Sequence, residues 1–201
     1  TGLWKENKNH GVWKFYYEDG ILKKTGSWNL GIQEGVWSYY NALGNLEERG
    51  EWKNGKAEGL WEYYFPAGKF KAAGRWQSGT QTGEWTYYYG NGFVKMRGNW
   101  TDGFNVDIWS YYYENGNIQK TGERANGHEI GLWTYYHQNG NKKEEVNFSS
   151  NGVETGVWKK YHENGNLAQE GEWIAGKQNG RWKYYNEKGT FVEEGYWKDG
   201  R

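Results

Sequence analysis

The 201 residues include 25 Lys and Arg against 25 Asp and Glu, so the formal net charge of zero argues against electrostatic capture of nucleic acid or of an anionic membrane. Cys is absent, which excludes disulfides and thiolate metal sites, and no apolar run approaches the ~18 residues of a membrane-spanning helix. Aromatic residues make up 20% of a chain whose mean hydropathy is −1.15, so we expect Trp and Tyr to supply the core.

Two interleaved Gly-x-Trp series run along the chain with a period of 24 residues. The first series is Gly11–Trp13, Gly35–Trp37, Gly59–Trp61, Gly83–Trp85, Gly131–Trp133, Gly156–Trp158 and Gly180–Trp182. The second series is Gly2–Trp4, Gly26–Trp28, Gly50–Trp52, Gly74–Trp76, Gly98–Trp100, Gly171–Trp173 and Gly195–Trp197. A fixed period of this length predicts a repeat array, so the argument concerns a surface rather than a catalytic pocket.

We number the places of one unit from one to 24 and take Gly35–Glu58 as the type, with Gly at places one, 10, 16 and 21 and Trp at places three and 18. After a partial unit over residues 1–10, units start near residues 11, 35, 59, 83, 107, 131, 156 and 180, which predicts one continuous array over 1–201. Tyr fills place six in every unit, at Tyr16, Tyr40, Tyr64, Tyr88, Tyr112, Tyr136, Tyr161 and Tyr185.

The residues of each unit predict, in chain order, a strand, a turn, a second strand and a second turn. An interior Gly costs a helix about 1 kcal/mol relative to Ala, so Gly every few residues argues against any helix longer than one turn. The β-branched and aromatic stretch from Val36 to Tyr40 favours a strand instead.

The two turns of a unit carry different signals. Places nine and 10 read Asn-Gly or Asp-Gly in five units, as at Asn91-Gly92, which is typical of a two-residue type I′ hairpin turn. Leu43-Gly44 and two other units suit that turn less well, which leaves longer loops open. Gly at place 21 predicts a type II′ turn between units.

These turns set a register in which Trp at place three faces Gly at place 16, and Trp at place 18 faces Gly at place one. Cross-strand Cβ atoms are only ~5 Å apart, so an indole that lies flat across its neighbour needs Gly there. Val at Gly74 or Gly98 should then strike Trp61 or Trp85. Place five and the mostly apolar place 12 share the Trp face, and the Tyr of place six lies on the other.

A three-residue bulged loop would instead put the two Trp series on opposite faces. The fold class predicted from the two-residue register is all-β: an elongated single-layer antiparallel meander of about eight stacked β-hairpin repeats. Both ends of the chain fall inside a repeat, so we expect it to be part of a longer protein.

The half-unit Gly50–Trp61 (GEWKNGKAEGLW) resembles the MORN repeat, named for membrane occupation and recognition nexus. The full unit, with Trp-x-Tyr-Tyr and Asn-Gly, resembles the bacterial 24-residue variant often labelled a toxin–antitoxin antitoxin component. The resemblance covers essentially the whole chain. It implies consecutive β-hairpins in a single-layer sheet and, for function, scaffolding, dimerisation or contact with lipid.

One region departs from the repeat. Asp107 and Val146 replace Gly, Arg124 and Phe148 replace the Trp of place 18, and one residue is inserted between Val146 and Gly152. We interpret this region as drift, with a bend or a partner site as the alternative.

Candidate catalytic groups are few. The four His are His10, His128, His137 and His162. His137 and His162 occupy equivalent places in adjacent units, ~10 Å apart, which is too far for one metal ion, so we interpret the His as surface residues with a metal site as the alternative. Carboxylate pairs such as Glu144 and Glu145 are sequence neighbours and should point to opposite faces of a strand. The sequence therefore predicts no catalytic residue, no cofactor and no metal ion.

The Trp rows have a structural interpretation as the core and a functional one as a surface that stacks on ligands. The eight Tyr of place six, from Tyr16 to Tyr185, are the better candidate binding surface because the face they occupy is otherwise polar. The function predicted is a non-catalytic structural or protein-interaction scaffold, with the bacterial cell envelope or an assembly as its setting. A carbohydrate-binding module is the alternative. The expected partner is a protein, or a second copy, held through sheet edges or faces, with a glycan in the alternative.

Overall fold

The computed structural model describes all residues from 1 to 201 and is all-β. Seventeen antiparallel strands form an open sheet with no helix, as the Gly spacing predicts. Without helices, no segment has the helical length and apolarity needed to cross a membrane. The chain divides into two compact units, residues 1–94 with 100–103 and residues 95–99 with 104–201, and strand β9 (Val94–Thr101) is divided between them.

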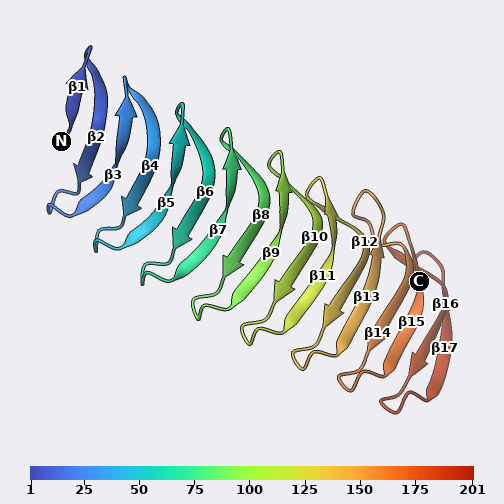
Figure 1. The fold of residues 1–201 in the computed structure, drawn as a ribbon. Coiled ribbons are helices and arrows are strands. Elements are labelled where there is room, and N and C mark those ends of the chain that lie inside the picture. The colour runs from blue at the N-terminus through green and yellow to red at the C-terminus, as the bar shows by residue number, and fades with distance from the viewer. The chain divides into compact units, whose positions relative to one another are not determined.

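Within each unit, every strand pairs with the next one along the chain (Figure 1). The strands of the first unit are β1 (Leu3–Lys5), β2 (Lys8–Tyr16), β3 (Leu22–Asn29), β4 (Ile32–Tyr40), β5 (Leu46–Lys53), β6 (Lys56–Tyr64), β7 (Phe70–Gln77) and β8 (Thr80–Tyr88). Those of the second are β10 (Phe104–Tyr112), β11 (Ile118–Ala125), β12 (His128–Tyr136), β13 (Lys142–Phe148), β14 (Gly156–Tyr161), β15 (Leu167–Ile174), β16 (Lys177–Tyr185) and β17 (Phe191–Trp197).

The register within each hairpin confirms the predicted pairing of Trp with Gly. On β4 and β5, Trp37 faces Gly50 and Gly35 faces Trp52. Paired residues of antiparallel strands point to the same face, so both Trp series lie on one face of the sheet. Contact between neighbouring indoles confirms this arrangement, because the ring centroids of Trp52 and Trp61 lie 5.6 Å apart in an edge-on geometry.

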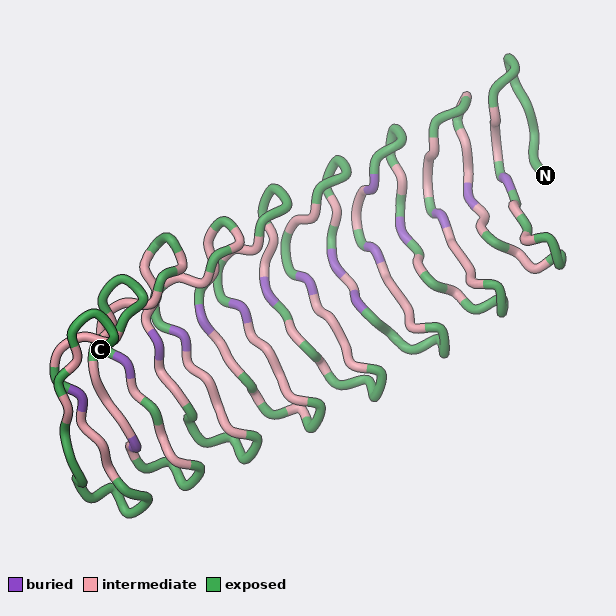
Figure 2. Tube along the Cα trace, turned by 180° about the vertical axis from the view of Figure 1, so that it is seen from behind, coloured by how far each residue is buried: buried purple, intermediate pink, exposed green.

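Every buried indole except that of Trp158 lies flat on the Gly of place 16 in the preceding repeat. A Cβ on Gly50 would come within 3.0 Å of the indole of Trp61, and the indole Nε1 of Trp61 donates to the carbonyl of Glu51. The eight Trp of place three are 9% exposed or less, and buried residues gather near the middle of the strands (Figure 2). They are Trp13, Trp37, Trp61, Trp85, Trp109, Trp133, Trp158 and Trp182. The core therefore consists of a row of indole rings packed against the backbone of the neighbouring strands.

This packing corrects the clash predicted for the second-series Gly. Gly74 pairs with Trp61 on one side, but the indole lying on it belongs to Trp85 of the following strand. In the same way, Trp109 lies on Gly98. The correction arises because a side chain at place three leans over the strand before its own.

The turn at places nine and 10 differs from the predicted type I′ turn. At Asn41–Asn45 the amide of Gly44 donates to the carbonyl of Asn41, and only Gly44 has a positive φ, at 81°. This pattern is a three-residue loop in which a type I turn is followed by a left-handed Gly. Asn is common here because its side chain accepts a turn amide, as Asn91 Oδ1 does from the amide of Phe93.

The longer loop does not move the Trp series to opposite faces. Tyr40 faces Leu46 while Tyr39 faces Glu48, so Glu47 is an extra, bulged residue. The loop shifts the register by one residue and the bulge shifts it back. The bulge also places the apolar residue of place 12 beside the Tyr of place six, as the 4.9 Å contact of the Tyr64 and Phe70 rings shows, so the prediction that place 12 shares the Trp face is wrong.

The turn between units is type I′ rather than the predicted type II′. Asn54 and Gly55 both have positive φ, at 52° and 74°. This turn pairs Trp52 with Ala57, so the second-series Trp does not face the next Gly of place one, as the predicted register required. That Gly, Gly59, has a φ of 66° and lies in a bulge that brings the register back before Trp61.

The region that departs from the repeat shows how the packing changes when place 16 carries a side chain, as it does at Val146. Val146 is only 3% exposed, and the next indole, Trp158, donates to the carboxylate of Glu144 instead of to a backbone carbonyl. Strands β13 and β14 correspondingly share only two paired positions, at Glu144 and Glu145. The inserted residue enlarges the following turn, in which the amide of Gly152 donates to the carbonyl of Ser149.

Candidate functional site

The eight predicted Tyr of place six lie on the face opposite the Trp core. In the first unit they are Tyr16, Tyr40, Tyr64 and Tyr88, and in the second Tyr112, Tyr136, Tyr161 and Tyr185. Tyr16 is 48% exposed and the other seven are half-buried. The sheet therefore presents the predicted row at its surface, and its role in binding stays a prediction.

Several of these Tyr are already engaged by neighbouring side chains. The hydroxyl of Tyr64 donates to Glu62, that of Tyr161 to Glu145, and that of Tyr185 to Glu170. The ring of Tyr64 stacks on Phe70. These Tyr side chains are thus already packed and hydrogen-bonded within the protein, which leaves less of each ring free to stack on a ligand.

A row of exposed aliphatic side chains at place two lies beside the Tyr row, and sequence reasoning missed it. Its members in the first unit are Val12, Val36 and Leu60, and in the second Ile108, Leu132 and Val157, all between 51% and 62% exposed. Glu84 and Arg181 take the same place in the other two repeats. The periodic aliphatic residue was visible in the sequence, but only the register shows that it faces solvent.

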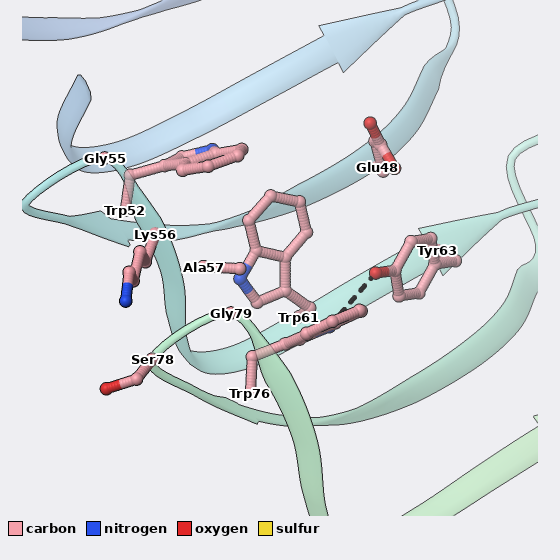
Figure 3. Close-up of a pocket in the computed structure, with 10 residues that line it drawn as sticks. All are labelled: Glu48, Trp52, Gly55, Lys56, Ala57, Trp61, Tyr63, Trp76, Ser78 and Gly79. Atoms are coloured by element: carbon pink, nitrogen blue, oxygen red, sulfur yellow. Dashed lines mark hydrogen bonds between the residues drawn. The ribbon is translucent and has the colours of Figure 1, made fainter. Parts of the chain in front are cut away.

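The Trp face carries an open groove of about 530 Å³ in the first unit. Figure 3 shows the indole of Trp61 between those of Trp52 and Trp76, with Glu48 and Tyr63 toward one end. The indole Nε1 of Trp76 donates to the hydroxyl of Tyr63 over 3.2 Å. Arg124, which replaces Trp at the same place of another repeat, donates likewise to Tyr111 over 3.0 Å.

The half-buried Tyr on the Trp face predict a loss of stability at alkaline pH. Burial raises the pKa of Tyr63 from 10.0 to about 12, and burial likewise raises the pKa of Tyr39 and of Tyr111. A phenol whose pKa is higher in the folded state stabilises the fold fully below its unfolded pKa, and this contribution is lost as the pH rises through the folded value.

We therefore expect the free energy of unfolding to fall between pH 10 and pH 12, the interval set by the pKa of Tyr63. Urea denaturation across this interval measures the fall, and Tyr63→Phe should make it shallower. A free energy that stays level to pH 12 would contradict the assignment.

His137 and His162 join neighbouring repeats rather than each other. The Nε2 atom of His137 lies 3.1 Å from the carbonyl oxygen of Tyr161, and that of His162 lies 3.0 Å from the carbonyl oxygen of Tyr185. The hydroxyl of Tyr17 makes the equivalent bond to Tyr40 in the first unit. These His therefore serve a structural contact at the sheet surface.

The neighbouring carboxylates point to opposite faces, as predicted. Glu144 accepts from the indole of Trp158 on the core face, while Glu145 accepts from the hydroxyl of Tyr161 on the other. A shared acid–base site cannot form from such a pair.

Comparison with known proteins agrees with this architecture. The MORN repeat variant family matches residues 9–29, 33–54, 108–126, 129–150 and 154–175, slightly more than half of the chain. The fold defines a β-hairpin repeat protein of the MORN type. The chain belongs to the MORN repeat variant family, a repeat type that is not enzymatic, and the antitoxin label stays a prediction.

No curated protein matches the sequence. Among solved structures, the crystal structure of TcdB2-TccC3-Cdc42 is similar at 11% identity and a TM-score of 0.23 over 90% of this chain, and that of TcdB2-TccC3 at 10% identity and 0.23 over 89%. This chain spans about 12% of the length of each. Likeness at these values is too slight to indicate a function.

Proposed function

We propose that this chain is a non-catalytic scaffold that binds a protein partner through the face opposite its Trp core. The observation that supports the proposal is the row of aliphatic side chains at place two, which are more than half exposed in both units. The residues paired with them are polar, as Glu51 is opposite Val36, so the row is a regular line of apolar anchors separated by polar groups.

The spacing of the row suits an extended protein surface. Val12, Val36 and Leu60 lie on β2, β4 and β6, so neighbours are two strands, or ~10 Å, apart. Place four, between the aliphatic residue and the Tyr, is polar, as at Ser38 and Glu62. A partner would meet apolar anchors beside polar groups, which is the composition of protein interfaces.

A carbohydrate ligand is less well supported on this face. Sugar rings stack on bare aromatic faces, but Tyr64 is stacked on Phe70 and bonded to Glu62. Tyr185 similarly contacts Phe191 and Glu170. Aliphatic residues at place two also lack the flat ring that stacking requires.

Photo-crosslinking tests the proposal. A photoreactive amino acid at Val36 or Leu132 should give a discrete protein adduct in the source cells, and excess unmodified chain should compete it away. The matched control is the turn residue Leu43, which is 78% exposed but lies outside the row. Equal adducts at all three positions, or polysaccharide capture that depends on Tyr64, would overturn the proposal.

A further inference from the structure

The groove on the Trp face exists because one repeat lacks a side chain that its neighbours have. Opposite the residue of place 18, the other pairs place a longer polar residue: Asn9, Gln33, Gln81, Glu129, Glu154 and Gln178. Gln33, for example, reaches the hydroxyl of Tyr39 over 3.3 Å. Ala57 stands at this place beside Trp52, and the space that a longer side chain would take remains open between Trp52 and Trp76.

Two lysines of this chain show what the aromatic face accepts. Lys120, at place 14, holds its ammonium 4.9 Å from the ring centroids of both Tyr111 and Trp133. Lys24, at the same place of another repeat, lies 4.8 Å from Phe15 and 5.8 Å from Trp37. These distances are within the ~6 Å of a cation–π contact.

The repeat that carries the groove has an acid at this place. Glu48 lies between Tyr39 and Tyr63 on the neighbouring strands, as Lys120 lies between Tyr111 and Tyr135. In this repeat the aromatic face therefore carries the carboxylate of Glu48 at the place where the repeats of Lys24 and Lys120 hold an ammonium group.

Glu48 has no cationic partner within the protein. It takes part in none of the ion pairs of the structure, and burial, then the charge of neighbouring Glu47, raises its pKa. Tyr39 and Tyr63 are the titratable groups that face it from the flanking strands. Lys56 also lines the groove, but Figure 3 shows its Nζ directed away from Trp61.

We propose that this groove binds an alkylammonium cation, with the rings of Trp52, Trp61, Trp76 and Tyr63 around the cationic group and Glu48 as its counter-ion. Aromatic rings attract cations through the negative potential of their faces, and quaternary ammonium groups are a common ligand of such cages. The site is on the face opposite the aliphatic row, so it is independent of the proposed protein-binding surface. Its ligand is either a small molecule such as choline or the side chain of a methylated lysine.

Calorimetric titration of the whole chain distinguishes the ligand chemistry. Choline and a peptide carrying trimethyllysine test the two sources, and the tighter binder identifies the source. The neutral isostere of choline, 3,3-dimethylbutan-1-ol, should bind at least about tenfold more weakly, because it keeps the shape and loses the charge. Equal binding of the neutral isostere, tighter binding of a neutral glucan oligosaccharide, or no binding of either cation at millimolar concentration would overturn the proposal.

Substitutions locate the site. Ala57→Gln restores the side chain found in neighbouring repeats and should abolish binding without harm to the fold. Glu48→Gln should weaken binding about tenfold, while Glu47→Gln, at the bulged neighbour, should leave it unchanged. The indole N–H resonances of Trp52 and Trp76 should shift on addition of the cation in the unmodified chain and in Glu47→Gln, but not in Ala57→Gln. Binding that persists in Ala57→Gln with an unchanged affinity would place the cation elsewhere and refute the assignment.

Discussion

Replacement of Gly74 by Val should lower the free energy of unfolding by about 3 kcal/mol or more, at the upper end of the cost of overpacking. A Cβ on Gly74 would come within 3.0 Å of three ring atoms of Trp85, which is itself only 2% exposed and cannot move outward without losing its burial. Gly98→Val should behave likewise, because Trp109 lies on Gly98 in the same way.

Urea denaturation followed by Trp fluorescence measures this effect. The matched control is Lys71→Val, which introduces the same side chain at an exposed position of the same strand and should change stability by less than ~0.5 kcal/mol. A loss no larger in Gly74→Val than in Lys71→Val would show that the indole can move aside at little cost.

The chain contains a natural example of the accommodation that such a variant would need. Where Val146 stands in place of Gly, Trp158 rests on the ring of Trp182, at 5.2 Å between centroids, and bonds to Glu144. Gly74→Val has no carboxylate at the equivalent place, because Ala72 is there. The loss of the indole hydrogen bond from Trp85 to the carbonyl of Arg75 would therefore add to the clash.

Replacement of Trp37 by Ala should cost about 3–5 kcal/mol, as is usual for a buried aromatic residue. Its side chain is 0% exposed, stacks between Phe15 and Tyr39, and donates to the carbonyl of Ser27. Removal would leave a cavity over Gly26 and delete the indole hydrogen bond to Ser27, and no second layer lies above the indoles to close the gap.

The control for this variant is Trp4→Ala. Trp4 is 66% exposed and contacts Trp13 edge-on, so its loss should cost less than ~1 kcal/mol. Equilibrium denaturation of both variants measures the two losses of unfolding free energy. Similar losses in Trp37→Ala and Trp4→Ala would mean that the stacked indoles are not the main source of stability.

The sequence by itself determined the repeat, the absence of helix, the antiparallel hairpins and the pairing of Trp37 with Gly50. These features follow from local rules, because Gly spacing excludes helix and an indole across a strand needs a residue without a side chain. The sequence also determined that Glu144 and Glu145 point apart, since side chains alternate along any strand.

Only the tertiary structure decided how the register is kept through each turn. A three-residue loop and a bulge at Glu47 shift the register in opposite senses, and the net result is the same as that of the shorter turn the sequence favoured. For the same reason, the sequence misplaced the apolar residue of place 12. Local composition does not reveal such compensation, because the bulges at Glu47 and at Gly59 depend on how each strand pairs with its neighbour.

The candidate sites show the same division. The Tyr row could be read from the period, but the exposure of Val36 and its equivalents depends on which face the indoles of Trp37 and Trp52 occupy. The groove required more still: Ala57 and Glu48 are unremarkable in the sequence, and only the register of β5 and β6 brings their places together with Trp61 and Tyr63. Sequence period fixes what recurs in every repeat, whereas a site formed by what one repeat lacks depends on contacts between strands.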